Sequence, residues 1–430
     1  MPPRTAIASS LLSALLSSTV SALPIVDAPA SQPGVSSVVQ SKIDEGVAAL
    51  RNGNLGAAQS AFEAALATNP RAVGGFLGLA EVAGRRGDDA AVEAWLQKGL
   101  AAAPGDVDLL HTLGVWYARK GRLADAEKTL AEAARLAPRS APVLASLGDV
   151  YLTNSNTLRQ AEDAFRRAVA ADPACLPCHI GLSRALAGLG DLTQARSVLE
   201  KAVKSVPSDP RPLYALGRLA ASQGQFEEAI AYHQRAIAVA PDFLAAYLDQ
   251  GDLYLSRNDI DKAVASYRSG VASAKDPVPA LFRLGVAYEA AGRFDEAERA
   301  YLDAVARDPM LYGAYNNLAF MCAQRKVKLD EALKWAQRAN DLAPRSGTVR
   351  DTLGWVYRAR GDLTKAARTI EEAARLSPDD ATIQYHLGIV YSELGRKPES
   401  VAALKRALAL SPNFRQAADA RQRLQELGSN

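Results

Sequence analysis

Apolar residues recur at helical spacing along most of the chain, and the pattern restarts at a fixed interval marked by proline. The spacing is 34 or 35 residues, apart from one double step in which Lys275 stands at the expected position. Because proline stops a helix, each interval predicts a self-contained unit of short helices. The marker prolines are Pro70, Pro104, Pro138, Pro173, Pro207, Pro241, Pro309, Pro344, Pro378 and Pro412.

Two neighbouring positions in each interval have nearly fixed residue types. The ninth residue after the marker is Leu in every repeat except one, which has Gln250, and the tenth residue is always small. Glycine within a helix costs about 1 kcal/mol relative to alanine, so a compensating contact is expected. We therefore expect two helices to cross at the tenth position with almost no side chain between them. The small residues are Ala80, Gly114, Gly148, Ser183, Gly217, Gly251, Gly285, Ala319, Gly354 and Gly388.

A second small residue lies five positions before each marker, and a glycine stands between the two predicted helices in most repeats. Glycine adopts the positive φ that ends a helix, so each interval predicts a helical hairpin. The second small residues run from Ala65 and Gly99 to Ala373 and Ala407. The turn glycines are Gly53, Gly87, Gly121, Gly190, Gly224, Gly292, Gly361 and Gly395.

This pattern resembles the tetratricopeptide repeat family over residues 39–414, as eleven repeats. The resemblance implies an all-α fold, a right-handed superhelical solenoid of about eleven hairpins. Two repeats carry one extra residue, near "TNSNTL" and "QRKVKL". A single hairpin cannot bury its apolar face, so a stack of hairpins is expected despite the length of the chain. Residues 415–430 are predicted to form a cap helix with Ala417, Ala420, Leu424 and Leu427 facing inward.

The amino-terminal segment predicts export. Residues 1–22 have one basic residue, Arg4, then a stretch rich in Ala, Leu and Ser, and small residues Val20 and Ala22 suited to cleavage. The alternative is a disordered leader on a cytoplasmic protein. Residues 23–38 contain three prolines and predict a linker. From residues 1–22 we expect an exported protein of the periplasm or envelope. No later apolar run is long enough to span a bilayer, so we expect no integral membrane segment.

Composition and charge narrow the candidate functions. The 50 basic and 47 acidic residues are interspersed along the chain, and a net charge of +3 gives no footprint for nucleic acid. Only 38 residues precede the repeats and 16 follow them, too few for a catalytic domain. The four histidines, His111, His179, His233 and His386, lie in four different repeats without metal-ligand spacing. We expect no catalytic, cofactor-binding or metal-binding residues, and no enzyme.

One motif leaves alternatives open. "CLPCH", from Cys175 to His179, matches the attachment pattern for c-type haem, but it straddles a repeat junction where hairpins pack together. The other interpretations are a pair of small packing residues or a local disulfide between Cys175 and Cys178. Cys322 takes a position that Tyr fills in several other repeats, so it is predicted to be a buried structural thiol.

The family resemblance also implies a concave groove, lined by the first helix of each hairpin, that holds a peptide or protein partner. The fourth, seventh, eleventh and fourteenth residues after each marker share one helical face. At these positions, aromatic, amide and charged residues are concentrated in the later repeats, from about Tyr214 to Tyr385. Some of these residues could instead pack between hairpins. The predicted partner-binding residues are Tyr214, Arg218, Phe282, Asn316, Phe320, Asp351, Trp355, Arg358 and Tyr385.

Two finer resemblances bear on the partner. The carboxylate clamp of chaperone-adaptor repeats requires Asn at the eleventh position, and no repeat has Asn there. Residues 315–380 are similar to envelope repeat proteins that accompany bacterial polysaccharide export, but those relatives are often lipid-anchored and this chain lacks the cysteine for it. The sequence thus favours a non-enzymatic interaction scaffold in an envelope assembly, with a cytosolic scaffold or a haem redox protein as alternatives.

Overall fold

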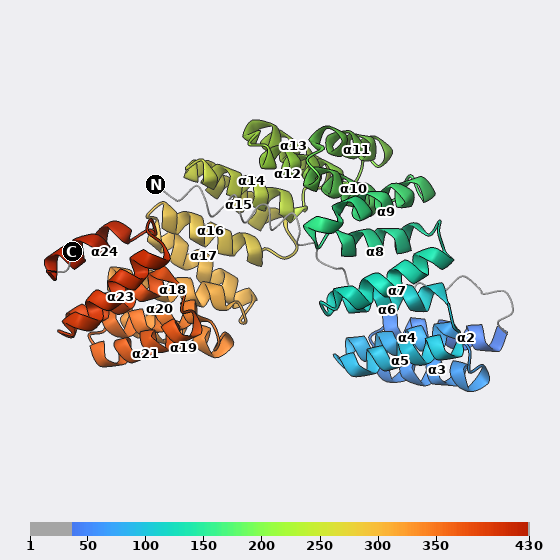
Figure 1. Ribbon diagram of the computed structural model, residues 1–430, viewed down its shortest axis with the longest axis horizontal. Helices are drawn as coiled ribbons and strands as arrows, with labels where there is room; N and C mark the ends of the chain where they lie inside the picture. Colours follow the sequence, from blue (N-terminus) through green and yellow to red (C-terminus); the bar gives the residue numbers. More distant parts are fainter. Residues whose placement is uncertain (1–36, 429–430) are drawn as a thin grey trace. The chain divides into compact units, whose positions relative to one another are not determined.

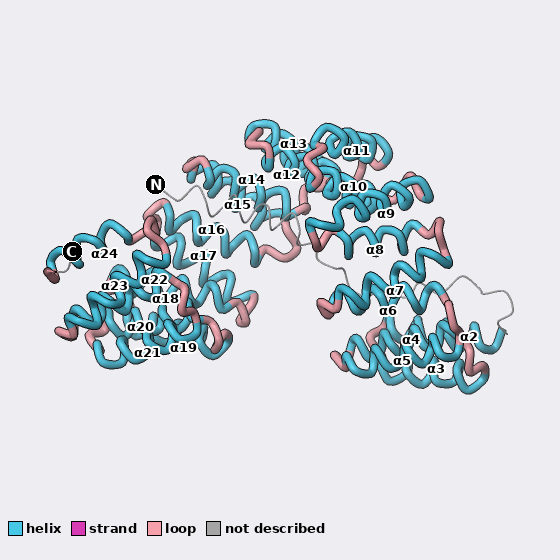
Figure 2. Tube along the Cα trace, viewed as in Figure 1, coloured by secondary structure: helices cyan, strands magenta, loops and turns pink. Residues whose placement is uncertain are grey.

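The computed structural model describes residues 37–428, and every regular element within that range except one 3₁₀ turn is an α-helix (Figures 1 and 2). The chain divides into two compact units between Tyr232 and His233. The helices of the N-terminal unit are α2 (Ser37–Arg51), α3 (Leu55–Thr68), α4 (Val73–Arg85), α5 (Asp89–Ala102), α6 (Val107–Arg119), α7 (Leu123–Leu136), α8 (Ala141–Tyr151), α9 (Leu158–Ala171), α10 (Leu176–Gly188), α11 (Leu192–Ser205) and α12 (Arg211–Ser222).

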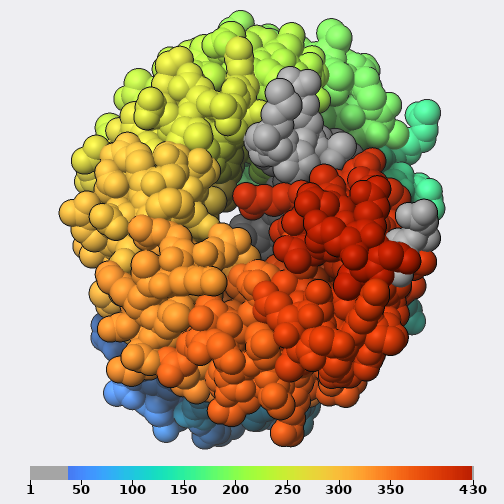
Figure 3. All heavy atoms as spheres, turned by 90° about the vertical axis from the view of Figure 1, so that its left-hand side faces the viewer, coloured from blue at the N-terminus to red at the C-terminus, as the bar shows by residue number. Residues whose placement is uncertain are grey.

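The C-terminal unit has the same pattern of paired helices. It takes the second half of α13, which contains the boundary, and all later helices. These are α13 (Phe226–Val239), α14 (Leu244–Ser256), α15 (Ile260–Ser273), α16 (Val278–Ala290), α17 (Phe294–Arg307), α18 (Tyr312–Arg325), α19 (Leu329–Leu342), α20 (Gly347–Ala359), α21 (Leu363–Leu376), α22 (Ala381–Glu393), α23 (Lys397–Leu410) and α24 (Ala417–Glu426). The helices pair consecutively, from α2 with α3 to α22 with α23, which confirms the eleven predicted hairpins. The space-filling view shows α14–α17 in yellow to orange and α18–α24 in orange to red as neighbouring bands (Figure 3).

The turn between the two helices of each hairpin has the predicted backbone geometry. All eight predicted turn glycines have positive φ, for example 72° at Gly53 and 71° at Gly121. One repeat has Asn258 at this place, with φ 61°, because asparagine tolerates the left-handed region better than most residues. Aspartate often follows the glycine and caps the second helix, as when Asp191 Oδ1 accepts a hydrogen bond of 3.0 Å from the Gln194 backbone N–H.

The sequence predicted that two helices cross at the small residue of the tenth position with almost no side chain between them. This prediction is wrong, because a large side chain fills the space there. Six glycines at the tenth position instead make room for a large side chain of the second helix: Gly114, Gly148, Gly251, Gly285, Gly354 and Gly388. A Cβ built on Gly285 would lie 2.5 Å from Cε1 of Tyr301, and one on Gly148 would lie 2.7 Å from Cε2 of Phe165. Tyr301 is fully buried, so the physical reason is that burying a whole ring offsets the cost of a helical glycine.

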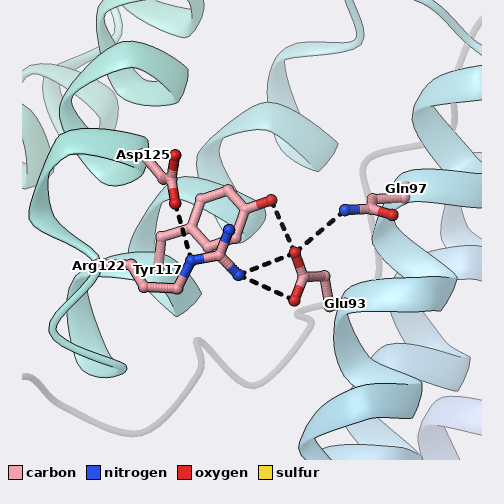
Figure 4. Close-up of polar contacts among 5 residues, drawn as sticks. All are labelled: Glu93, Gln97, Tyr117, Arg122 and Asp125. Carbon is pink, nitrogen blue, oxygen red and sulfur yellow. Dashed lines mark hydrogen bonds and ion pairs between the residues drawn. The ribbon is translucent and has the colours of Figure 1, made fainter.

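Polar contacts also join consecutive repeats (Figure 4). Tyr117 on α6 donates a hydrogen bond of 3.0 Å from its hydroxyl to Glu93 on α5, and Arg122 Nη1 donates to both oxygens of the same carboxylate. The Arg122 guanidinium also lies 4.2 Å from the Tyr117 ring centre, and its Nε donates to Asp125 at 2.8 Å. Gln97 completes the group, because its Nε2 donates a hydrogen bond of 3.1 Å to Glu93 Oε1. The bidentate pair and the stacked ring fix how far one hairpin can rotate against the next.

The same arrangement recurs in the C-terminal unit. Tyr391 on α22 donates a hydrogen bond of 2.8 Å to Glu371 on α21, and Arg396 stacks 4.2 Å from the Tyr391 ring centre. Arg396 also lies 3.5 Å from the Glu371 carboxylate. The repeated Tyr, Arg and Glu are thus a connection between hairpins rather than a binding site.

The two extra residues are accommodated within the turns of their own hairpins. The insertion near "TNSNTL" forms a 3₁₀ turn at Ser155–Thr157, and the insertion near "QRKVKL" places Lys326 and Lys328 at φ 53° and 48°. Helix α2 already contains Ser37 and Val38, the last two residues of the predicted linker. The predicted signal segment 1–22 and the linker up to residue 36 lie outside the described residues.

Helix α24 covers the end of the last hairpin. Ala417, Ala420 and Leu424 are buried against the preceding helices, whereas Arg421 and Gln422 are exposed. The apolar stripe was therefore predicted correctly from its helical spacing. Between residues 37 and 428, no helix combines the length and the apolar character that crossing a bilayer requires.

Candidate functional site

The predicted groove residues divide between the two units. Tyr214 and Arg218 lie on α12 in the N-terminal unit, with the Arg218 guanidinium 5.9 Å from the Tyr214 ring centre. The other seven lie on α16, α18, α20 and α22 of the C-terminal unit, all of them first helices of hairpins. The richest combination of side chains therefore belongs to the C-terminal unit, where it forms an open pocket and an aromatic cluster.

The pocket surrounds Phe282 and has a volume of about 820 Å³. We call it the Phe282 pocket. It is formed by α14, α15, α16 and the turn between α17 and α18. Its lining residues are Asp252, Leu255, Tyr267, Asp276, Val278, Pro279, Phe282, Arg283, Val286, Arg307, Asp308 and Leu311.

Several of these residues stand at the positions that the sequence assigned to the groove. Phe282 is at the seventh position of its repeat, Asp252 and Val286 are at the eleventh, and Leu255 is at the fourteenth. Val286 is 37% exposed although it is aliphatic. These positions of α14 and α16 thus line a partly apolar, open pocket, while the predicted role of this face in binding a partner stays a prediction.

Apolar side chains form the base of the pocket. The Phe282 ring packs against the buried ring of Tyr301, with centroids 5.9 Å apart. On its other side lies Gly313, where an added Cβ would be 3.4 Å from the Phe282 ring. The ring is therefore held from α17 and α18 while one part of it remains accessible, which suits a preorganised apolar contact.

Charged groups border the apolar base. Asp252 accepts a hydrogen bond of 2.5 Å from the Tyr267 hydroxyl and is ion-paired with Arg283. Burial raises the pKa of Asp252 above its ordinary value, and the positive charge of Arg283 only partly opposes the rise. The side chain of Arg283 is 41% exposed, so the guanidinium can still donate to a ligand in the pocket.

Asp276 and Asp308 have structural uses at the rim. Asp276 Oδ1 accepts a hydrogen bond of 3.1 Å from the Val278 backbone N–H, and Asp308 Oδ1 accepts one of 2.9 Å from the Met310 backbone N–H. Both carboxylates are thereby engaged in turns that start the next first helix. Arg283 and the exposed Arg307 remain as the cationic groups that face a ligand.

A second feature is the aromatic cluster around His386, formed with Phe320, Trp355 and Tyr385. We call it the His386 cluster. The Trp355 ring stacks on His386 at a centroid distance of 4.0 Å, and the rings of Tyr385 and Phe320 lie 5.7 and 6.1 Å away. His386 Nδ1 lies 2.6 Å from Asp351 Oδ2. The structure thus brings together residues from three successive repeats.

Within this cluster, burial separates packing residues from accessible ones. Asp351 and Tyr385 are only 4% and 8% exposed, so they support their neighbours and offer little surface to a partner. The Tyr385 hydroxyl donates a hydrogen bond of 2.6 Å to Asp419 on α24. Trp355 and Arg358 are partly exposed, and the Arg358 guanidinium lies 4.3 Å from the Trp355 ring centre.

Arg358 and Asn316 complete the positions predicted from the sequence. Arg358 Nε donates to Glu393 at 2.9 Å, which holds the guanidinium flat over Trp355. Asn316 Nδ2 lies 3.5 Å from Asn317 Oδ1, while its own Oδ1 is buried without a hydrogen-bond partner in the described chain. The side-chain oxygen of Asn316 on α18 is therefore an acceptor that the described residues leave unused.

Sequence reasoning overlooked three residues that shape the pocket: Tyr267, Asp252 and Arg283. Asp252 stands at the eleventh position of its repeat and Arg283 at the eighth position of the next. The signal that could have found Asp252 and Arg283 is their opposite charge in neighbouring repeats, 31 residues apart in the chain. Tyr267 comes from the second helix and carried no groove signal.

The "CLPCH" motif is folded as a disulfide. Cys175 and Cys178 are bonded to each other, and His179 Nε2 lies 2.9 Å from the Pro173 carbonyl oxygen. In this arrangement neither sulfur nor that ring nitrogen is available to hold haem. Cys322 is fully buried, as predicted. In residues 37–428, no group of three or more His, Cys, Asp or Glu side chains could hold a metal ion.

Comparison with known proteins supports the repeat assignment along nearly the whole chain. One tetratricopeptide repeat model matches residues 200–427, just over half of the chain. It is described as the cilia and flagella-associated protein 70 C-terminal domain. Tetratricopeptide repeat models match residues 43–107, 112–174 and 152–219. No curated protein sequence matches the chain significantly.

Solved structures with similar folds include three repeat proteins. Yeast Tom70 shares 14% identity, with 91% of this chain and 95% of that chain covered and a TM-score of 0.46. The Cut9–Hcn1 complex of the APC/C shares 15% identity, with 90% and 96% covered and a TM-score of 0.45. PilF of Pseudomonas aeruginosa shares 21% identity, with 50% and 97% covered and a TM-score of 0.42. With the family models, the eleven hairpins and the turn glycines in agreement, the chain belongs to the tetratricopeptide repeat family.

Proposed function

We propose that this protein is an interaction scaffold that holds an extended segment of a partner protein against the first helices of its C-terminal unit, and that the groove acts by binding alone. One observation carries the proposal. The Phe282 pocket combines an accessible apolar base, formed partly by residues at the groove-facing positions of α14 and α16, with Arg283 and Arg307 at its border. Its volume falls in the range of pockets that bury a ligand of several side chains.

The chemistry of the pocket indicates the partner segment. An apolar or aromatic side chain would fill the space beside Phe282, where burial of its surface supplies most of the binding free energy. A carboxylate next to it would pair with Arg283 or Arg307, because guanidinium groups favour bidentate contacts. Trp355 and Arg358 of the His386 cluster would contact a later part of the same segment.

Selection from a random peptide library on the full chain tests this function. We expect selected peptides to share an apolar residue flanked by Asp or Glu. Phe282→Ala should weaken their binding at least tenfold, since truncating a central aromatic contact costs roughly 2 kcal/mol or more. The matched control is Tyr312→Ala, at a tyrosine that is 47% exposed outside the pocket, which should leave binding unchanged. Equal effects of the two variants would contradict the proposal.

We further propose that the protein works outside the cytoplasm, in an envelope assembly for export, polysaccharide handling or secretion. Two features support this location: the signal-like residues 1–22 and the Cys175–Cys178 disulfide, because disulfides persist mainly in oxidising compartments. Mass spectrometry of the protein isolated from its native cells should find an N-terminus near Leu23. An intact leader in the cytoplasmic fraction would favour a cytosolic scaffold instead.

A further inference from the structure

The disulfide of the N-terminal unit lies at the start of α10. Cys175 is the N-cap residue, Leu176 and Pro177 form the first turn, and Cys178 follows on the same turn. The Cys178 backbone N–H is 3.3 Å from Cys175 Sγ. The sulfur of Cys175 therefore lies at the positive end of the helix and faces a backbone donor, a place where a thiolate is stabilised.

The repeat does not need a cross-link at this junction. Other repeats cap the equivalent helix with Ser or Asp, as when Ser346 Oγ accepts from the Val349 backbone N–H at 3.4 Å. The disulfide closes a loop of only three residues' separation, and such short loops gain the least from cross-linking. Structural stabilisation thus gives a weak reason for placing two cysteines here.

The two sulfurs differ in access. Cys178 is completely buried, whereas Cys175 is partly exposed and is followed by the exposed Pro177. An external thiolate can reach only Cys175, and breaking the bond leaves the buried Cys178 sulfur as the leaving group. The difference in exposure therefore fixes Cys175 as the sulfur that is attacked and Cys178 as the sulfur that leaves.

His179, the residue after Cys178 in the chain, has one imidazole nitrogen without a hydrogen-bond partner among the described residues. His179 is 7% exposed, and its Nε2–H donates to the Pro173 carbonyl oxygen at 2.9 Å, which leaves Nδ1 as an acceptor. Nδ1 is buried and has no hydrogen-bond partner among residues 37–428. Buried polar atoms without partners are rare in folded proteins, so this one indicates a role that the oxidised state leaves unused.

We propose that Cys175 and Cys178 form a thiol–disulfide exchange site that oxidises a pair of thiols in a peptide or protein. A substrate thiolate attacks Cys175 Sγ, the Cys175–Cys178 bond breaks, and its electron pair goes to Cys178 Sγ, which takes up a proton. The second substrate thiolate then attacks the substrate sulfur of the mixed disulfide and releases Cys175 as a thiolate. The substrate loses two electrons and two protons, and the protein gains a dithiol; a small-molecule disulfide can restore the oxidised state.

The first test uses the oxidised full-length chain and a reduced synthetic peptide with two cysteines, mixed without oxygen at neutral pH. We expect one peptide disulfide to form per chain, with the rate about tenfold or more above that of oxidised glutathione at equal concentration. Alkylation and mass spectrometry should then find Cys175 and Cys178 reduced. An intact protein disulfide, or a rate no higher than that of oxidised glutathione, would overturn the proposal.

The second test distinguishes the two cysteines. Reduced Cys178→Ser, mixed with the oxidised peptide, should accumulate a mixed disulfide at Cys175, because the sulfur that would resolve it is absent. Cys175→Ser should form no adduct, since Cys178 is buried. Helicity is checked for both variants by circular dichroism, and the wild-type measurement stands alone if either variant fails to fold. Equal trapping at both positions would also overturn the proposal.

Discussion

Replacing Gly285 by alanine should destabilise the C-terminal unit, although alanine is the better helix former. The gain in helix propensity is about 1 kcal/mol. The added Cβ, however, would lie 2.5 Å from Cε1 and 2.6 Å from Cδ1 of Tyr301, whereas carbon atoms in contact prefer about 3.5 to 4.0 Å. The Tyr301 ring would have to move by roughly 1 Å within a closed interior.

The ring is not free to move without loss. Its hydroxyl donates to Glu289 Oε2 at 3.2 Å and accepts from Asn317 Nδ2 at 3.2 Å. Overpacking of a core costs about 1 to 3 kcal/mol, and the weakened hydrogen bonds add up to about 1 kcal/mol. After the gain in propensity is subtracted, the expected net loss of stability is roughly 0 to 3 kcal/mol, with a central value of about 1.5 kcal/mol.

Gly56→Ala is the matched control. Its added Cβ would have only Asn54 Oδ1 within 4 Å, at 3.8 Å, so this variant should be as stable as the wild type or more stable, by up to about 1 kcal/mol. Urea unfolding followed by circular dichroism measures the difference. Hydrogen exchange should locate the Gly285→Ala effect in α16, α17 and adjoining hairpins, because repeats couple mainly to their neighbours. Stabilisation by Gly285→Ala would refute the reasoning.

Three further predictions concern single groups. Burial raises the pKa of Cys322 to about 11, so iodoacetamide should leave it unmodified at pH 8 until urea unfolds the chain; prompt labelling of the folded chain would contradict this. The double variant Trp355→Ala with Phe320→Ala should weaken partner binding while circular dichroism shows unchanged helicity; unchanged binding would move the site elsewhere. The pKa of Asp252 is higher in the folded chain than in the unfolded chain. The contribution of Asp252 to the free energy of unfolding is therefore fully present below the unfolded-state pKa and declines as pH rises through the folded-state pKa. As pH rises above about 4, Asp252→Asn should therefore lose less stability than wild type in urea unfolding, and an unchanged pH slope would contradict this.

The fold could be predicted from the sequence because its determinants are local. Proline and turn glycine recur in most hairpins and a small residue in every one, and each acts through local geometry that a linear pattern records. The apolar stripe of α24 was equally visible, with Ala420 and Leu424 buried as expected. The error at the tenth position arose because spacing shows where room is needed but not what fills it, here the ring of Tyr301.

The candidate site was predictable only in part. Helical spacing placed Phe282 and Trp355 on first helices, where the structure has them on α16 and α20 and partly exposed; their role in binding a partner stays a prediction. It could not show that Tyr385 would be covered by packing against α24, because that contact joins residues 34 positions apart through the hydroxyl bond to Asp419. The Asp252–Arg283 pair was missed for the same reason, since pairing between repeats depends on side-chain reach.

The most direct test of the central claim is photo-crosslinking in the native cell with benzoylphenylalanine in place of Phe282. The account predicts a covalent adduct with one partner protein, lost when a peptide selected on the purified chain competes, and absent when the same group replaces Tyr312. An adduct at position 312 but not at 282, or one that the peptide does not displace, would show that the Phe282 pocket is not where this protein holds its partner.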